Sequence, residues 1–189
     1  DGRTKLDRVV DAALALARTA LARGDRVGCL LFGAEPETLV APGRGSSHFA
    51  PLASALGLAR SRIEESDYAA AFDALLARQR RRALVVLFTD LVDPDTSALV
   101  LARAAALRGR HLPWVVAVAD SAIADLAGAI PDTASQALAR LAAERILEER
   151  DRAVGRLRGA GVRVLSTPAS ALGGALVGGY LEVKARGRL

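Results

Sequence analysis

The sequence predicts an α/β fold, in which helices cover both faces of a mostly parallel sheet. Short apolar runs typical of strands alternate with longer segments whose apolar residues recur every three or four positions, the period of a helix. Several runs are apolar at every position, which is typical of parallel strands buried on both faces. We therefore expect a three-layer, doubly wound sheet, and we expect residues 1–189 to form a single domain.

Composition indicates one sizeable core and argues against a disulfide-stabilised or membrane-spanning chain. Of the 189 residues, 51% are hydrophobic and only 4% aromatic, so we expect a core of Leu, Val and Ala. The only cysteine, Cys29, lies within an apolar run and excludes an internal disulfide. The sequence has no apolar stretch long enough to span a membrane, so we expect a soluble, cytoplasmic chain.

Positive charge is spread along the chain and does not predict a nucleic-acid site. The formal net charge is +5, and nearly all the basic residues are arginines in Ala-rich segments. The densest group, residues 78–82, ends a predicted helix, where cations interact favourably with the helix dipole. It contains no aromatic residue that could stack on a base. We therefore expect no nucleic-acid partner.

The first half of the chain contains three predicted helices and a hairpin. Apolar residues at helical spacing predict a helix over residues 6–23. Strands over residues 26–33 and 37–42 are expected to pair as a hairpin. Residues 43–47 are rich in Gly and Ser, and we expect a serine to cap the helix that follows. Two helices are then predicted over residues 49–60 and 68–80.

In the second half of the chain, buried strands alternate with helices. The predicted strands span residues 83–88, 113–119 and 162–165. The predicted helices span residues 95–108, 132–158 and 169–183. In the last of these helices, we expect the glycines of GGALVGGY to allow close packing against another helix.

Acidic residues follow two of the predicted strands. Asp90 comes directly after LVVLFT, which we expect to be a central strand, and Asp120 follows the next strand. The functional crevice of a doubly wound sheet lies beyond the carboxyl ends of its strands, and one or two carboxylates suffice to hold Mg²⁺ with waters. Asp90 is therefore a candidate metal ligand. Asp93 and Asp95 lie around Pro94, where we expect one of them to cap the next helix.

Motifs of other catalytic classes are missing from the sequence. It contains no Gly-Lys-Ser/Thr phosphate loop. His48 and His111 lack the spacing of zinc ligands, and Ser46 and Ser47 do not lie in a nucleophile elbow. We therefore predict no catalytic residue and do not expect an enzyme.

Several motifs resemble those of known domains. GDRVGCLLFG and LVVLFTD resemble a von Willebrand factor A-type domain, in which a Gly-Asp-x-Val-Gly strand precedes a buried strand ending in Thr-Asp. The segments TKLDRVVDAALALARTAL, PGRGSSHF, TDLVD and GGYLEVKARGRL are similar to a bacterial branch, the domain-of-unknown-function family 58. This likeness extends over almost the whole chain.

The resemblance implies a metal-ion-dependent adhesion site that holds Mg or Mn. Asp90 matches the aspartate that ends a later strand, and Ser46 or Ser47 stands where these domains have a threonine. Their Asp-x-Ser-x-Ser loop would precede Asp1, on a central strand that this chain lacks. We therefore expect weak metal binding, with Asp90 close to Ser46 and Ser47.

The missing central strand would lie between the strands RVGCLLF and ALVVLF. We expect one of three arrangements: an upstream segment supplies it, the two strands pair directly, or a second copy of the chain contributes a strand.

The resemblance also implies a role. It points to a noncatalytic protein-protein interaction module that works with a MoxR-type AAA ATPase in chaperone-like assembly, with Asp93 and Asp120 on the partner-binding face. Family members often carry membrane-spanning helices before this domain, which implies anchoring at the inner face of the cell membrane through segments outside this sequence. The alternative is a metal-dependent phosphotransfer or hydrolytic enzyme that uses Asp90. Such an enzyme would have a second acid at the position of Val92.

Overall fold

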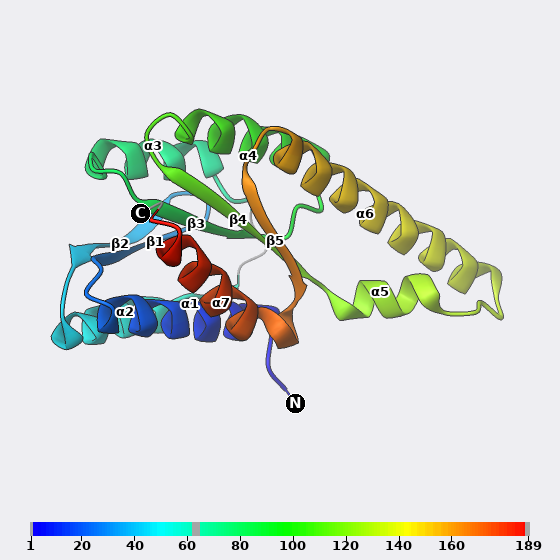
Figure 1. Ribbon diagram of the computed structural model, residues 1–189. Coiled ribbons are helices and arrows are strands. Elements are labelled where there is room, and N and C mark those ends of the chain that lie inside the picture. Colours follow the sequence, from blue (N-terminus) through cyan, green and yellow to red (C-terminus); the bar gives the residue numbers. More distant parts are fainter. Residues whose placement is uncertain (1, 62–64, 188–189) are drawn as a thin grey trace. The chain divides into compact units, whose positions relative to one another are not determined.

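The computed structural model describes residues 2–61 and 65–187, and it has the expected α/β fold (Figure 1). Its α-helices are α1 (Lys5–Ala22), α2 (Phe49–Gly57), α3 (Tyr68–Arg78), α4 (Pro94–Leu107), α5 (Ser121–Gly128), α6 (Ala134–Gly159) and α7 (Leu172–Ala185). Its strands are β1 (Val27–Phe32), β2 (Pro36–Gly43), β3 (Leu84–Thr89), β4 (Leu112–Ala119) and β5 (Arg163–Pro168). Short 3-10 turns, η1 (Ser46–His48) and η2 (Ala169–Ala171), precede α2 and α7.

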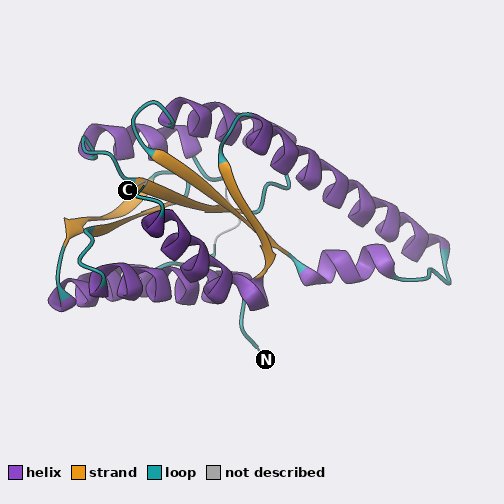
Figure 2. Ribbon diagram, viewed as in Figure 1, coloured by secondary structure: helices purple, strands orange, loops and turns teal. Residues whose placement is uncertain are grey.

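The chain divides into two compact units, each with its own sheet. One unit comprises Asp1–Ala83 and Ser170–Leu189, and the other comprises Leu84–Ala169. Figure 2 shows strands and helices in both. The predicted strands and helices all occur within a few residues of their predicted bounds, except that α5 was not predicted.

The second unit is built on a parallel sheet of order β3–β4–β5. Residues 113–118 of the middle strand β4 are all buried. On one side, α4 packs against β4, α6 packs against β5, and the two helices contact each other. Val100 and Leu107 of α4 and Leu157 of α6 are at most 2% exposed and contribute to this core. The parallel sheet was predicted correctly from its apolar runs.

Strand β3 lies at the edge of the described sheet, with β4 as its only described partner. Its run LVVLF predicted a central strand of a complete sheet, next to the position of a strand missing from this chain, and that further strand stays a prediction. The first five residues of β3 are accordingly only partly buried. The described strands form two separate sheets, so direct pairing of β1 with β3 is not the arrangement found.

The first unit contains the predicted antiparallel hairpin of β1 and β2. Val27 and Cys29 of β1 pack against a cluster of buried residues from α1 and α2, formed by Ala17, Leu21 and Leu52. Phe32, later in β1, makes an edge-to-face contact with Tyr68 of α3. Burial raises the pKa of the half-buried Cys29 thiol. Cys29 is therefore a protonated packing residue of the hairpin.

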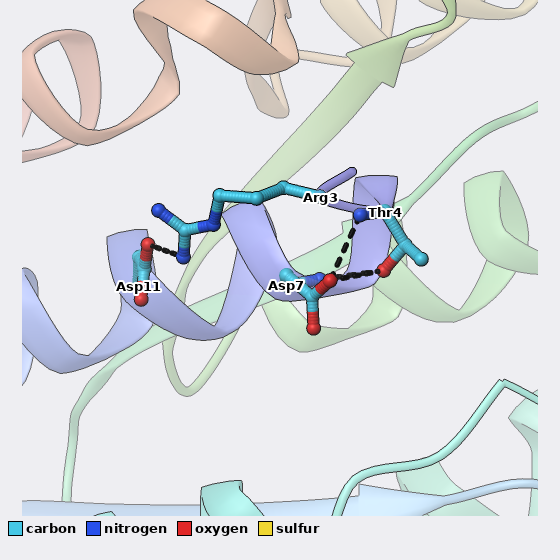
Figure 3. Close-up of polar contacts among 4 residues, drawn as sticks. All are labelled: Arg3, Thr4, Asp7 and Asp11. Carbon is cyan, nitrogen blue, oxygen red and sulfur yellow. Dashed lines mark hydrogen bonds and ion pairs between the residues drawn. The ribbon is translucent and has the colours of Figure 1, made fainter. Parts of the chain in front are cut away.

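Helix α1 begins at Lys5 because Thr4 and Asp7 form a capping box (Figure 3). The Asp7 backbone N–H donates to Thr4 Oγ1 (3.1 Å), and the Thr4 backbone N–H donates to Asp7 Oδ2 (2.8 Å). These bonds satisfy amides that the first turn of a helix leaves without partners. Hydrogen bonds from the Thr4 backbone and side chain lower the pKa of Asp7. Arg3 forms an ion pair with Asp11 one turn further along.

Asp25, between α1 and β1, is held by two residues of α7. Tyr180 Oη donates to Asp25 Oδ2 (2.5 Å), and Lys184 Nζ donates to Asp25 Oδ1 (2.6 Å). Burial raises the pKa of Asp25, but the hydrogen bonds from Lys184 and Tyr180 outweigh burial, and the net shift is downward. Burial and the bond to Asp25 raise the pKa of Tyr180, so its phenol remains a donor. Asp25 thereby attaches α7 to the end of α1.

Two local expectations were wrong. An added Cβ at Gly173, Gly174 or Gly178 of α7 would meet no atom within 4 Å, so these glycines do not mark close helix packing. The N-cap of α2 is His48, which makes no capping side-chain bond, while Ser46 and Ser47 form the preceding 3-10 turn. The backbone N–H of Phe49, the first residue of α2, donates to the Ser46 carbonyl oxygen within this turn.

Replacing Asp25 by Asn is expected to lower the free energy of unfolding by about 1 kcal/mol at pH 7, because the ion pair with Lys184 is lost. The pKa of Asp25 in the folded protein lies below its ordinary value of 3.8. The contribution is therefore complete above pH 3.8 and is lost as pH falls through the folded-state pKa. Urea unfolding at pH 7 and at successively lower pH should show the difference from wild type shrinking in acid.

Glu35→Gln, an exposed substitution in the turn between β1 and β2, is the matched control and should be near neutral at every pH. A difference between wild type and Asp25→Asn that did not depend on pH would contradict this account.

Candidate functional site

The edge at which β3, β4 and β5 end is the candidate site, and we call it the carboxyl edge. The parallel register aligns Thr89 of β3 with Ala117 of β4, and Ala117 with Ser166 of β5. These three residues form one row across the sheet. Asp90 follows Thr89 directly and is exposed. The prediction that Asp90 lies at the carboxyl end of a strand is therefore confirmed.

Two of the acids predicted at this edge cap helices. Asp93 is the N-cap of α4, and its Oδ1 accepts a hydrogen bond from the Thr96 backbone N–H (2.6 Å). Asp120 is the N-cap of α5, and its Oδ1 accepts from the Ala122 backbone N–H (3.0 Å). The hydrogen bond from Thr96 lowers the pKa of Asp93. Capping explains why carboxylates follow these strands, since each strand leads into a helix whose first amides need acceptors.

Arg150 of α6 lies across the row of aligned residues. Its Nη2 donates to the Ala117 carbonyl oxygen (2.9 Å) and to Ser166 Oγ (3.0 Å), so one guanidinium binds both β4 and β5. The residue is only 8% exposed. Its Nε is buried and has no hydrogen-bond acceptor among the described residues. A buried guanidinium is therefore fixed at the carboxyl edge.

The charge of Arg150 is partly balanced by nearby acids. Burial lowers the pKa of Arg150, and the negative charges of Asp151 and Asp90 oppose that shift. Because an arginine keeps its proton in proteins, the guanidinium is a permanent cation, and it interacts electrostatically with the Asp90 carboxylate. The edge therefore carries its own positive charge.

The turn after Asp90 is strained. Leu91 has φ of 55°, in the left-handed region that residues with a side chain rarely adopt. Its side chain is only 1% exposed, so burial offsets a backbone cost of order 1–3 kcal/mol. The turn sends Leu91 into the core and leaves Asp90 exposed. Strain of this kind is concentrated at functional sites, which makes Asp90 the strongest candidate residue at this edge.

The donor set at this edge does not fit a divalent cation by itself. Among the residues that the structure describes, no three His, Cys, Asp or Glu side chains are grouped so as to hold a metal. Asp93 and Asp120 already accept backbone hydrogen bonds, and a guanidinium stands near Asp90. Hard cations such as Mg²⁺ need several oxygen ligands that are not otherwise engaged.

Ser46 and Ser47 belong to the other unit, where both are exposed in η1. The next residue, His48, is fixed over the hairpin: its Nε2 donates to the Val27 carbonyl oxygen (2.9 Å). A Cβ at Gly43 would lie 2.3 Å from the His48 ring, so this position requires glycine. The PGRGSSHF segment therefore has a packing role in the hairpin. The pairing of Asp90 with Ser46 and Ser47 stays a prediction.

Arg150 was missed by sequence reasoning, although a signal existed. It occupies a position on the buried side of α6, in line with Ala143, Val154 and Leu157. A charged residue within the apolar side of a helix must find partners or lose hydration at high cost. That signal indicates a buried polar contact but does not identify the partners, which lie on β4 and β5.

Comparison with protein families identifies the chain. Residues 2–151 match the family model described as protein of unknown function DUF58. The chain belongs to the DUF58 family. The match includes Asp90, Asp93, Asp120 and Arg150 of the carboxyl edge.

The DUF58 match ends within α6, so the similarity suggested by the tail GGYLEVKARGRL lies outside it. No curated protein and no solved structure matches the chain. In the described part of this DUF58 chain, none of the helices is long and apolar enough to cross a membrane.

Arg150→Met is expected to lower the free energy of unfolding by about 1–3 kcal/mol, because it removes hydrogen bonds from a charged donor to β4 and β5. Chemical denaturation measures the change. Arg156→Met, an exposed substitution on the same helix, is the control and should change stability by less than about 0.5 kcal/mol.

A double-mutant cycle of Arg150→Met with Asp90→Asn isolates the charge interaction between the two residues. Strictly additive effects would show that the charges of Arg150 and Asp90 do not interact. Equal effects of Arg150→Met and Arg156→Met would show that the guanidinium does not hold the carboxyl edge.

Proposed function

We propose that this chain is a noncatalytic protein-protein interaction module that engages its partner through the carboxyl edge. The supporting observation is the fixed guanidinium of Arg150, bound to β4 and β5 beside the exposed Asp90. Charged groups held in one orientation give specificity in recognition, because a partner must match their positions and signs.

The other groups at the edge suit recognition as well. Asp93 and Asp120 present their carboxylates from helix caps, so their orientations are set by backbone amides. Each has a backbone donor as its described partner, an arrangement that orders a carboxylate for recognition. We infer that these acids lie on the partner-binding face together with Asp90.

The partner that the family resemblance implies is a MoxR-type AAA ATPase, with a chaperone-like role in assembly. An Asp/Arg surface of mixed charge is suited to a partner surface that also carries both signs. The mixed charge of the carboxyl edge and the family resemblance both support this partner.

Binding to a purified MoxR-type AAA ATPase encoded in the same genome is the direct test. Asp90→Lys is expected to weaken binding at least about tenfold, because it reverses the charge beside Arg150. Glu35→Lys, the same change in an exposed turn of the other unit, should leave the affinity within about twofold. Titration calorimetry measures both. No binding by wild type, or equal binding by all three proteins, would reject the carboxyl edge as the interface for this partner.

A divalent cation is proposed to contribute little. We expect the chain to bind Mg²⁺ or Mn²⁺ more weakly than about 1 mM, so that EDTA changes the affinity for the ATPase only slightly. Tight metal binding in calorimetry would show instead that Asp90 is joined by other acids, such as Asp93 and Asp120, in a complete site.

We also propose a von Willebrand factor A-like sheet, in which a further strand pairs with β3 on the side opposite β4. The support is that β3 has the apolar run of a central strand yet lies at an edge of the described sheet. A long apolar edge strand is a template for additional pairing, and native proteins usually cover one.

Hydrogen exchange of this chain tests the proposed vacancy. The outward amides of β3 are expected to exchange much faster than the buried amides of β4. Equal protection of the two strands in a monomer would show that β3 is already paired and would remove the need for another strand.

A further inference from the structure

Exposed apolar side chains are concentrated on the helical hairpin of α5 and α6. Figure 1 shows α5 continuing from the end of β4, and α6 returning antiparallel to it. Six large hydrophobic residues are exposed in the described part of the chain, and four of them lie within residues 126–141. They are Leu126 (41% exposed), Ile130 (86%), Leu138 (68%) and Leu141 (60%). We call these four residues the hairpin patch.

The hairpin patch is separate from the core of its unit. Helix α5 contains no buried residue, and the buried residues of α6 begin only at Ala143. The second half of α6 therefore packs into the core, while the first half presents leucines to solvent. Exposed apolar residues gathered on one helical hairpin are typical of an interaction site in a folded protein.

Leu138 and Leu141 lie on one face of α6, because residues three apart in a helix are neighbours. The same face continues to Arg145, four residues after Leu141, and Arg145 is exposed. On the other side of the leucines, the exposed Asp132 stands just before the N-cap residue Thr133. The stripe thus has an apolar centre, an acid at one end and a base at the other.

Such a stripe is complementary to itself when two copies run antiparallel. With a rise of about 1.5 Å per residue, Arg145 lies about 8 Å beyond the midpoint of the two leucines, and the N-cap Thr133, which follows Asp132, lies about 10 Å before that midpoint. The length of the arginine side chain spans the difference. A two-fold axis at the midpoint would therefore place Leu138 of one copy against Leu141 of the other copy. It would also place Arg145 of each copy within reach of Asp132 of the other.

We propose that two copies of this chain associate through the hairpin patch, with their α6 helices antiparallel. Two-fold dimers use one self-complementary surface on both copies, and the order of acid, leucines and base along α6 has this property. Ile130 and Leu126 extend the apolar contact onto the turn and α5. This self-association goes beyond the proposed partner binding, which uses the carboxyl edge.

Light scattering and sedimentation of the 189-residue chain test the proposal. Wild type is expected to approach twice the monomer mass of 19.7 kDa as concentration rises. Leu138→Ser combined with Leu141→Ser should raise the dimer dissociation constant at least about tenfold, because it removes the apolar centre. Leu58→Ser, at an exposed leucine in the other unit, is the matched control and should leave the constant unchanged. Circular dichroism checks that each variant is folded.

Charge reversal tests the antiparallel arrangement itself. Asp132→Arg alone and Arg145→Glu alone should each weaken the homodimer, because each brings like charges together. The double variant should recover it, and an equimolar mixture of the two single variants should form the heterodimer. A wild-type monomer at all concentrations, a dimer that tolerates the leucine substitutions, or single variants that do not complement each other would overturn the proposal. Association with the AAA ATPase in place of self-association is one such result.

Discussion

The parallel register of β4 with both of its neighbours is the constraint on which the carboxyl edge depends. The pairing aligns Thr89, Ala117 and Ser166 in one row. Because of that row, a single guanidinium from α6 can reach the Ala117 carbonyl oxygen and the Ser166 hydroxyl together. A slip of one residue in the pairing of β4 with β5 would separate the two acceptors, and a slip in either pairing would turn the side chains of the shifted strand to the opposite face. The burial of β4 enforces the register, since residues 113–118 are enclosed on both faces.

Three of the charged side chains at the carboxyl edge are held in place by hydrogen bonds. The capping carboxylates of Asp93 and Asp120 satisfy the first amides of α4 and α5. Arg150 supplies a permanent cation that is bound to β4 and β5. Asp90 differs from the caps because it precedes Leu91, whose left-handed backbone is retained by burial of its side chain. Asp90 is therefore the exposed acid at the edge whose position costs local strain.

The two halves of helix α6 have different environments: the C-terminal half is buried in the core, and the N-terminal half carries exposed leucines. Its C-terminal half contributes Arg150, Ala153, Val154 and Leu157 to the core of the second unit. Its N-terminal half, capped by Thr133 and Gln136, carries Leu138 and Leu141 on the outside. The C-terminal half anchors the helix in the core, and the N-terminal half presents an apolar stripe to solvent.

The sequence by itself determined the α/β class, the bounds of nearly every helix and strand, the hairpin of β1 and β2, and the position of Asp90 after a strand. These features follow from local periodicity, apolar runs and capping residues, which act over a few neighbouring positions. Helix α5 was missed because its eight residues are too few to establish a period. Only the tertiary structure decided that β3 lies at an edge, that Arg150 of α6 binds β4 and β5, and that Asp25 binds Tyr180 and Lys184. The residues in those hydrogen bonds are 16 to 159 positions apart in the sequence. Which of many possible partners meet depends on how whole helices and strands pack together, and a local sequence pattern carries no information on that packing.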